Sequence, residues 1–344
     1  MSKLLSYSGV ITKIKAMEST FVSNQDYQKI VGLETVSDFI SYLKNHPGYM
    51  DIFQGLDEHT LHRGDVEGLF INSLYLAFAK IYRFSNLSQR KTLSLLFFRY
   101  EVNILKDCMK QIYTNKNTYD LSLFDSFFNR HSKINVNALA SSRKMEEYIN
   151  NLKSTEYYPM FIMLQNTQHL TPFDYEMQLD IYYFKKTWKL KDKLLSGDNL
   201  KAFTHTLGTE IDLLNILWLY RTKHFYNIPS SNLYFYVIPV NYKLTKEQLT
   251  KLMETNSSND FINQLKASSY EGIVPELLGN SMEFSFRKIV SKVYKDNASL
   301  YPTSMAPISN YLFLKETEVD KLTSALECIR YKLEPQDTLR YVLE

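Results

Sequence analysis

The sequence predicts an almost entirely α-helical protein built from three similar units. Three observations lead to this fold class: a scarcity of glycine, apolar residues that recur at helical spacing, and two sequence markers that each occur three times. Only 10 of the 344 residues are glycine, well below the usual share of about 7%. Because β-sandwiches, barrels and dinucleotide-binding folds depend on glycine-rich turns, this composition favours helices.

The first marker is a short segment that predicts the same helix three times. Residues 38–49 read DFISYLKNHPGY, residues 146–157 read EEYINNLKSTEY, and residues 260–270 read DFINQLKASSY. Their isoleucines are spaced 109 and 113 residues apart. Each copy carries an acid where the helix would begin, where a negative charge interacts favourably with the helix dipole. These acids are Asp38, Glu147 and Asp260. We therefore assign the acid, lysine and tyrosine of each copy to the scaffold.

The second marker predicts a longer helix in each unit. It occurs as YEVNILKDCMKQIY at 100–113, DLLNILWLYRTKHF at 212–225 and EVDKLTSALECIRY at 318–331. Its equivalent positions Ile104, Ile216 and Leu322 are 112 and 106 residues apart. In the first copy, apolar residues recur at steps of three or four, which is typical of an amphipathic helix.

Both markers recur in the same order with one period, which indicates a repeated architecture. We expect three helical repeats at 1–118, 119–229 and 230–344. Common solenoid repeats run to only about 20 to 50 residues, so we expect a trefoil with approximate threefold symmetry. One segment, LYFYVIP at 233–239, is a candidate for either a strand or a buried connector.

Charge and cysteine content exclude several classes of protein. The net charge of +3, from 40 basic and 37 acidic residues, gives no reason to expect a nucleic-acid partner. Cys108 and Cys328 have no metal-like flanking residues, which suits a reducing cytosolic compartment. The first residues lack the apolar core of a secretory signal, and no apolar run approaches the ~20 residues of a membrane-spanning helix.

We expect that the protein is not an enzyme. We assign no catalytic residue, no cofactor and no metal ligand from the sequence. Phosphate-binding loops, dinucleotide fingerprints, zinc-protease motifs and nucleophile elbows do not occur. His59 and His62 could share a helix face as metal ligands, but a solvated polar loop explains them better. The cluster KKTWKLKDK at 185–193 could face anionic lipid or a polyanion, although a solvated helix face is the favoured interpretation.

Several stretches then resemble one known family. PFDYEMQLDIYYF at 172–184 resembles a Pro-Phe-x-x-Glu-x-x-Leu-Asp-x-x-Tyr-Tyr helix of the C subunit of A-type and V-type rotary ATPases, whose eukaryotic counterpart is the d subunit. The segment 301–344 resembles the end of that family, and 7–19 resembles its first helix. FRYEVNILK at 98–106 matches a further helix, except that Tyr100 stands where the family usually has an acid.

The resemblance implies a funnel of three similar helical domains around a pseudo-threefold axis. It implies a non-catalytic central-stalk subunit that binds no nucleotide and has no transmembrane segment of its own. Such a rotor subunit holds the end of the central shaft and connects it to the membrane ring of proteolipid subunits, so that torque is coupled to ion transport. We accordingly expect a cytoplasmic protein, peripheral on the cytoplasmic face of the cell membrane.

Exposed positions on or near the second-marker helices are the predicted contacts with these partners. The residues are Arg99, Lys106, Arg221, Glu316, Glu318 and Arg330. A rival interpretation is that they join the repeats to one another through salt bridges. The alternative function is a helical adaptor that binds a peptide or an anionic membrane surface through 185–193. An enzyme that uses His59 and His62 is the third hypothesis.

Overall fold

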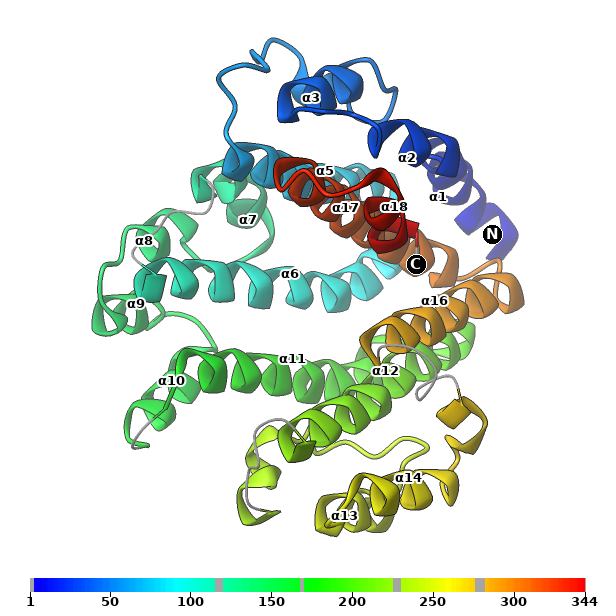
Figure 1. The fold of residues 1–344 in the computed structure, drawn as a ribbon. Helices are drawn as coiled ribbons and strands as arrows, with labels where there is room; N and C mark the ends of the chain where they lie inside the picture. The colour runs from blue at the N-terminus through cyan, green and yellow to red at the C-terminus, as the bar shows by residue number, and fades with distance from the viewer. Residues whose placement is uncertain (1–2, 115–119, 168–169, 225–229, 276–281, 344) are drawn as a thin grey trace. The chain divides into compact units, whose positions relative to one another are not determined.

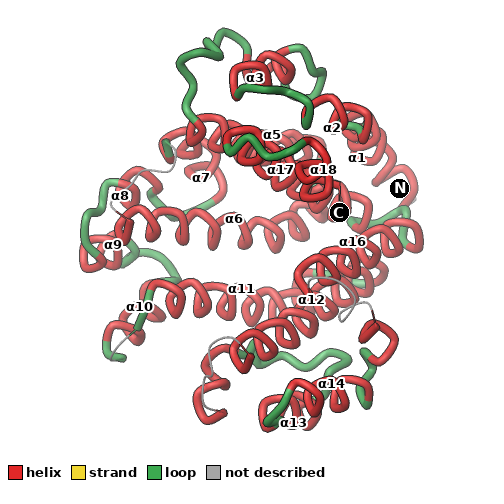
Figure 2. The backbone as a smooth tube through the Cα atoms, viewed as in Figure 1, coloured by secondary structure: helices red, strands yellow, loops and turns green. Residues whose placement is uncertain are grey.

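The predicted fold class, all-α, is confirmed. The computed structural model describes residues 3–114, 120–167, 170–224, 230–275 and 282–343. Within these ranges the chain consists of α-helices, 3-10 helices and loops, and no strand occurs (Figure 2).

The chain divides into two compact units. Unit 1 contains residues 1–90, 103–172 and 311–344, and unit 2 contains residues 91–102 and 173–310. Two long helices, α6 (Leu87–Thr114) and α17 (Ala306–Arg330), contribute residues to both units. The expected repeat boundaries at 118 and 229 lie outside the described residues, so the division into three repeats stays a prediction.

Unit 1 is assembled from short helices packed against long ones (Figure 1). Besides parts of α6 and α17, its helices are α1 (Lys3–Glu18), α2 (Asn24–Ile30), α3 (Val36–Lys44), α4 (Met50–Phe53), α5 (Arg63–Phe84), η1 (Leu121–Phe124), α7 (Asp125–His131), α8 (Val136–Ala140), α9 (Met145–Asn151), α10 (Tyr158–Gln165) and α18 (Pro335–Leu343). At the centre of one apolar cluster, the Phe70 ring contacts Phe39, Tyr49 and Phe53 edge-on at centroid distances of 6.1, 5.8 and 6.1 Å. All four rings are fully buried.

Unit 2 is built mainly around the long helix α12, which packs along α16 (Figure 1). Its helices, besides parts of α6 and α17, are α11 (Pro172–Leu194), α12 (Gly197–His224), η2 (Ser230–Tyr236), α13 (Lys246–Glu254), α14 (Ser258–Lys266), η3 (Glu271–Ile273) and α16 (Met282–Leu300). The Tyr220 ring on α12 contacts Phe261 on α14 at 5.7 Å. This contact buries the apolar face of the short helix against the long one.

The three copies of the first marker all form helices, namely α3, α9 and α14. Their aromatic residues Phe39, Tyr148 and Phe261 are at most 1% exposed. The tyrosines that end the three copies are also buried. These are Tyr49, Tyr157 and Tyr270. The marker therefore records the buried side of one helix and the loop that follows it.

The acids of the first marker lie in the first turn of their helices, as expected. The Thr35 hydroxyl accepts a hydrogen bond from the Asp38 backbone N–H at 3.1 Å and donates to the Asp38 carboxylate at 2.6 Å. Ser257 and Asp260 repeat this arrangement at 3.1 and 2.7 Å. Such capping fixes the helix starts, because the first-turn N–H groups have no partner within the helix.

The segment 233–239 is a connector that is buried only in part, since Tyr234 is 62% exposed, and the strand alternative is wrong. Leu233 lies in η2, and Val237 and Ile238 are buried beyond its end. The Asn215 side-chain amide on α12 forms two hydrogen bonds with the backbone of Ile238. It accepts one from the N–H group at 2.8 Å and donates one to the carbonyl oxygen at 3.0 Å. A side chain thus satisfies the main-chain groups that a neighbouring strand would otherwise have to pair.

Gly48 provides a stability prediction for the loop that follows α3. A Cβ atom at this position would lie 2.2 Å from the backbone carbonyl oxygen of Thr20. We expect Gly48→Ala to lower the free energy of unfolding by about 1–3 kcal/mol, because backbone atoms cannot move aside as a flexible side chain can. Urea denaturation followed by circular dichroism measures this change.

Gly9→Ala is the matched control. A Cβ atom at Gly9, within α1, meets no atom within 4 Å. Alanine is the better helix former, so this variant should be as stable as the parent or more stable. Equal stability of the Gly48→Ala variant and the parent would show that the loop does not depend on this close approach.

Candidate functional site

A buried carboxylate on α17 connects three separate segments of unit 1. Glu318 is only 5% exposed. It accepts hydrogen bonds from the Lys315 ammonium at 2.6 Å, the Tyr49 hydroxyl at 2.8 Å and the Val22 backbone N–H at 2.7 Å. Lys315 also donates to the Tyr49 hydroxyl at 2.9 Å. One side chain thereby fixes the positions of α17, the loop before α4 and the segment that precedes α2.

Burial shifts the titration of the groups around Glu318. Burial lowers the pKa of Lys315, the neighbouring Lys80 charge lowers it further, and the Glu318 carboxylate opposes both effects. Burial and the Glu318 charge raise the pKa of Tyr49 well above its ordinary value. The cluster therefore holds a hydroxyl donor and an ammonium in place around one carboxylate.

A second buried carboxylate, Asp212 on α12, connects separate segments of unit 2 in the same way. Its Oδ2 atom accepts from the backbone N–H groups of Lys243 and Leu244 at 2.8 and 2.9 Å, and from the Tyr270 hydroxyl at 2.8 Å. Its Oδ1 atom is buried without a hydrogen-bond partner. No described lysine or arginine forms an ion pair with it, and burial raises its pKa.

The two clusters share one plan. Each acid occupies the first position of a second-marker copy, and each tyrosine ends a first-marker copy. Each acid also binds the backbone N–H just before a capped helix: Ser23 caps α2 and Thr245 caps α13. In the remaining copy the acid position is occupied by Tyr100, which is 2% exposed. The sequence contained this signal, although neither marker alone revealed that the acid and the tyrosine would meet.

The predicted partner contacts differ in how the structure uses them. Arg99 forms an ion pair with Glu210 within unit 2, and its guanidinium lies 5.6 Å from the centre of the Tyr183 ring. Lys106 and Glu316 are half-buried. Much of the Arg99 side chain is therefore engaged inside the fold.

The other three predicted contacts separate clearly by exposure. Arg221 and Arg330 are exposed, and Arg330 lies 3.6 Å from Glu327 at the end of α17. Glu318 was expected among the exposed positions, and that expectation is wrong because its carboxylate is buried in the cluster described above. The roles of these residues in partner binding stay predictions.

Of the five lysines in the cluster at 185–193, two contact other side chains of the fold and three lie on one exposed face of α11. Lys186 places its ammonium 3.2 Å from the centre of the Phe98 ring. Lys191 is 5% exposed, bonds Asp192 at 2.8 Å and lies 4.2 Å from the Trp188 ring centre. Three lysines remain exposed on α11. They are Lys185, Lys189 and Lys193.

The histidine pair lies on an exposed loop that leads into α5. His59 Nδ1 is 3.1 Å from the Ser37 hydroxyl, and the His62 backbone N–H donates to Asp65 at 2.9 Å. In the part of the chain that the structure describes, no three His, Cys, Asp or Glu side chains gather in a way that could hold a metal ion. Nor does any described helix combine the length and apolarity needed to cross a bilayer.

The two acid clusters lead to contrasting mutational predictions. Glu318→Gln should lower the free energy of unfolding by about 3–5 kcal/mol, because it leaves the buried Lys315 ammonium without its counter-charge. Asp212→Asn should cost less than about 1 kcal/mol at neutral pH, because Asp212 has no cationic partner and its amide analogue keeps the acceptor oxygen. Urea denaturation of both variants measures the difference, and equal losses would contradict it.

The same pair differs in pH dependence. The folded-state pKa of Asp212 is raised above 3.8 by burial, so its contribution to stability is full below the unfolded pKa and is lost as pH rises through the folded pKa. Asp212→Asn should therefore reduce the decline in stability as the pH rises above about 4, the pKa of the unfolded carboxyl. An unchanged pH profile in this variant would show that the buried carboxyl does not titrate in that window.

Comparisons with known proteins agree over nearly the whole chain. The family model described as ATP synthase (C/AC39) subunit matches residues 10–341. The chain is 25% identical to the C subunit of the A-type ATP synthase of Methanosarcina acetivorans, in an alignment that covers 92% of this chain and 87% of the relative. It is 23% identical to the corresponding C subunit of Pyrococcus horikoshii over 97% of this chain and 89% of the relative. The chain belongs to the ATP synthase (C/AC39) subunit family.

Proposed function

We propose that this chain is the non-catalytic central-stalk subunit of a rotary ATPase and couples its rotating shaft to the proteolipid ring in the membrane. The observation that carries the proposal is the family match over residues 10–341, together with relatives named as the C subunit of the A-type ATP synthase. The chain would lie at the cytoplasmic face of the membrane, attached to a membrane complex through other subunits.

The helical construction suits a part that transmits torque. The helices α6 and α12 each have 28 residues, and α17 has 25. Shorter helices pack against them through buried rings, as Phe261 does against Tyr220. Close-packed interiors resist deformation. A body of this kind can carry a lateral load from one end to the other without a catalytic centre.

The repeated acid–tyrosine plan supports the proposed division into three repeats. Glu318 on one second-marker helix binds the tyrosine of the first repeat, and Asp212 binds the tyrosine of the third repeat. The two bonds fit a cyclic pattern in which each first-marker tyrosine joins the long helix of the neighbouring repeat. A pseudo-threefold arrangement would place the three copies in equivalent positions, and in the remaining copy Tyr100 replaces the acid.

Arg221 and Arg330 are the best placed of the proposed partner contacts, because both are exposed near the ends of long helices. Glu318 is better explained as a residue that holds the repeats together. Arg99 has its partner in Glu210 of the same unit. We keep Lys106 and Glu316 as secondary contacts.

Co-purification tests the proposed function directly. A tagged copy of the chain is expressed in its native cells, membranes are solubilised in mild detergent, and the captured proteins are identified by mass spectrometry. We expect the ATPase head, shaft and proteolipid subunits in the capture. Recovery of the folded chain without any of them would refute the proposal.

Arg330→Glu tests the partner contact. The reversal places a negative charge beside Glu327, and we expect a loss of complex recovery at a matched folded fraction. Lys153→Glu changes the same charge at another exposed position of unit 1 and should leave recovery unchanged. If Arg330→Glu lowers only the melting temperature, the residue stabilises the fold and does not bind the partner.

A further inference from the structure

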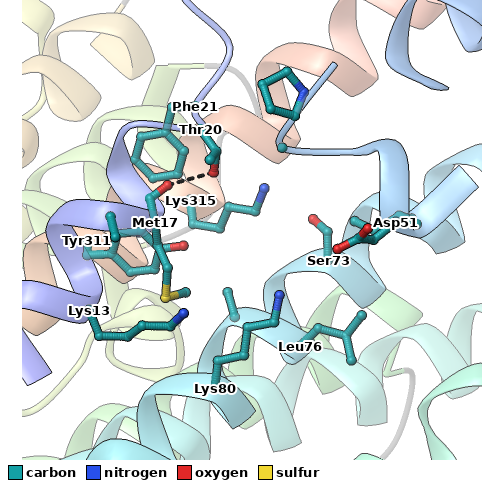
Figure 3. A pocket seen from close by; sticks show the side chains of 15 residues that line it. Lys13, Met17, Thr20, Phe21, Asp51, Ser73, Leu76, Lys80, Tyr311 and Lys315 are labelled. Carbon is teal, nitrogen blue, oxygen red and sulfur yellow. Dashed lines mark hydrogen bonds between the residues drawn. The ribbon is translucent and has the colours of Figure 1, made fainter. Parts of the chain in front are cut away.

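Unit 1 contains a cavity of about 300 Å³ between α1, α4, α5 and α17 (Figure 3). This volume lies at the lower end of the range typical of small-molecule sites, about 300–1,000 Å³. The cavity is separate from the predicted partner contacts, none of which lines it. Its lining gives it a clear chemical preference.

Three lysines reach the cavity from three different helices: Lys13 from α1, Lys80 from α5 and Lys315 from α17. The lining contains one carboxylate, Asp51, so positive groups outnumber negative ones. Figure 3 shows the Lys13 and Lys80 side chains entering the same space from one side. Like charges that share a cavity are unfavourable unless an anion is bound between them.

The charge of Lys315 is balanced, whereas the charges of the other two lysines are not. Lys315 bonds Glu318, which lies behind the cavity wall. No described carboxylate lies within ion-pair distance of Lys13 or Lys80; Lys13 instead lies 5.5 Å from the centre of the Phe84 ring. The Lys80 charge also lowers the pKa of Lys315, because like charges repel.

The remaining walls are firmly held and include further polar groups. Phe21 stacks on Tyr311 with ring centres 5.3 Å apart and planes 11° apart, which forms a flat aromatic side. Gly48 lies against the Thr20 carbonyl, and Ser73 and Asp51 also line the cavity (Figure 3). A preformed wall of this kind lowers the cost of ordering a ligand.

We propose that this cavity binds a small soluble anion that carries phosphate groups, held by Lys13 and Lys80 with Lys315 at its base. A phosphate group supplies several acceptor oxygens, and its negative charge is complementary to Lys13 and Lys80. Lysine binds phosphate as a point charge, which needs no planar geometry of the ligand. The proposal concerns ligand binding only and is independent of the proposed coupling function.

Isothermal titration calorimetry of the purified full chain with sodium pyrophosphate tests the proposal, at constant ionic strength set with sodium chloride. We expect saturable binding at one site per chain. The double variant Lys13→Gln/Lys80→Gln should weaken the Kd by at least about tenfold, because each lysine supplies a charge-assisted contact. The control variant Lys144→Gln/Lys153→Gln removes two exposed lysines of the same unit and should bind as the parent does.

Thermal unfolding provides a second readout that needs no heat of binding. Pyrophosphate should raise the melting temperature of the parent and of the control variant, and leave that of the double variant unchanged. Should the double variant lose its helical circular-dichroism signal, Lys80→Gln alone carries the test, because Lys80 is exposed.

Two results would overturn the proposal. One is the absence of pyrophosphate binding, or equal binding by the parent and the double variant. The other is binding of the parent only to vesicles of phosphatidylcholine and phosphatidylglycerol, with none to soluble pyrophosphate. That second outcome would assign the lysines to a lipid headgroup, which is a different ligand.

Discussion

The structure depends on a buried carboxylate that holds together segments far apart in the chain. Glu318 binds Tyr49 across 269 residues of sequence and Val22 across 296. A short helix with one apolar face is marginal by itself, so its position has to come from tertiary contacts. The hydrogen bonds to the acid are directional, whereas apolar packing is not. The long helix, the first-marker loop and the capped helix α2 are thereby fixed in one register.

The same device appears with different electrostatics in the two units. Glu318 has a cation, Lys315, whereas Asp212 is surrounded by hydrogen-bond donors without a positive charge. Removal of one partner from a buried ion pair leaves an uncompensated charge, so the two clusters should respond differently to loss of the acid's charge. In the remaining copy of the second marker the equivalent position carries Tyr100. The two acid clusters therefore share the same hydrogen-bonded arrangement and differ in whether a cation balances the buried charge.

Helical content and the marker helices could be predicted from sequence, because both follow from local spacing. The acids of α3, α9 and α14 lie at the helix starts as predicted, and their aromatic residues are buried. The side-chain partners could not be predicted in the same way. Glutamate is usually a surface residue. Only the three-dimensional fold reveals the hydrogen-bond donors that surround the buried carboxylate of Glu318. The segment at 233–239 has strand-like composition, but Asn215 on a helix forms hydrogen bonds with the backbone of Ile238. A local pattern cannot show such a partner.

Membership of the ATP synthase (C/AC39) subunit family gives these contacts a mechanical purpose. In the coupling role that we propose, the segments of the subunit must stay in register under load, and the acid–tyrosine bonds connect segments that are far apart in the chain. The most direct measurement is a structure of the intact complex, purified through this chain and determined by electron cryomicroscopy. The account predicts three helical repeats around the rotation axis. The shaft should contact one side of the folded subunit along this axis, and the proteolipid ring should contact the opposite side. The account would be contradicted if the subunit lay away from that axis, or if it contacted only the shaft or only the ring.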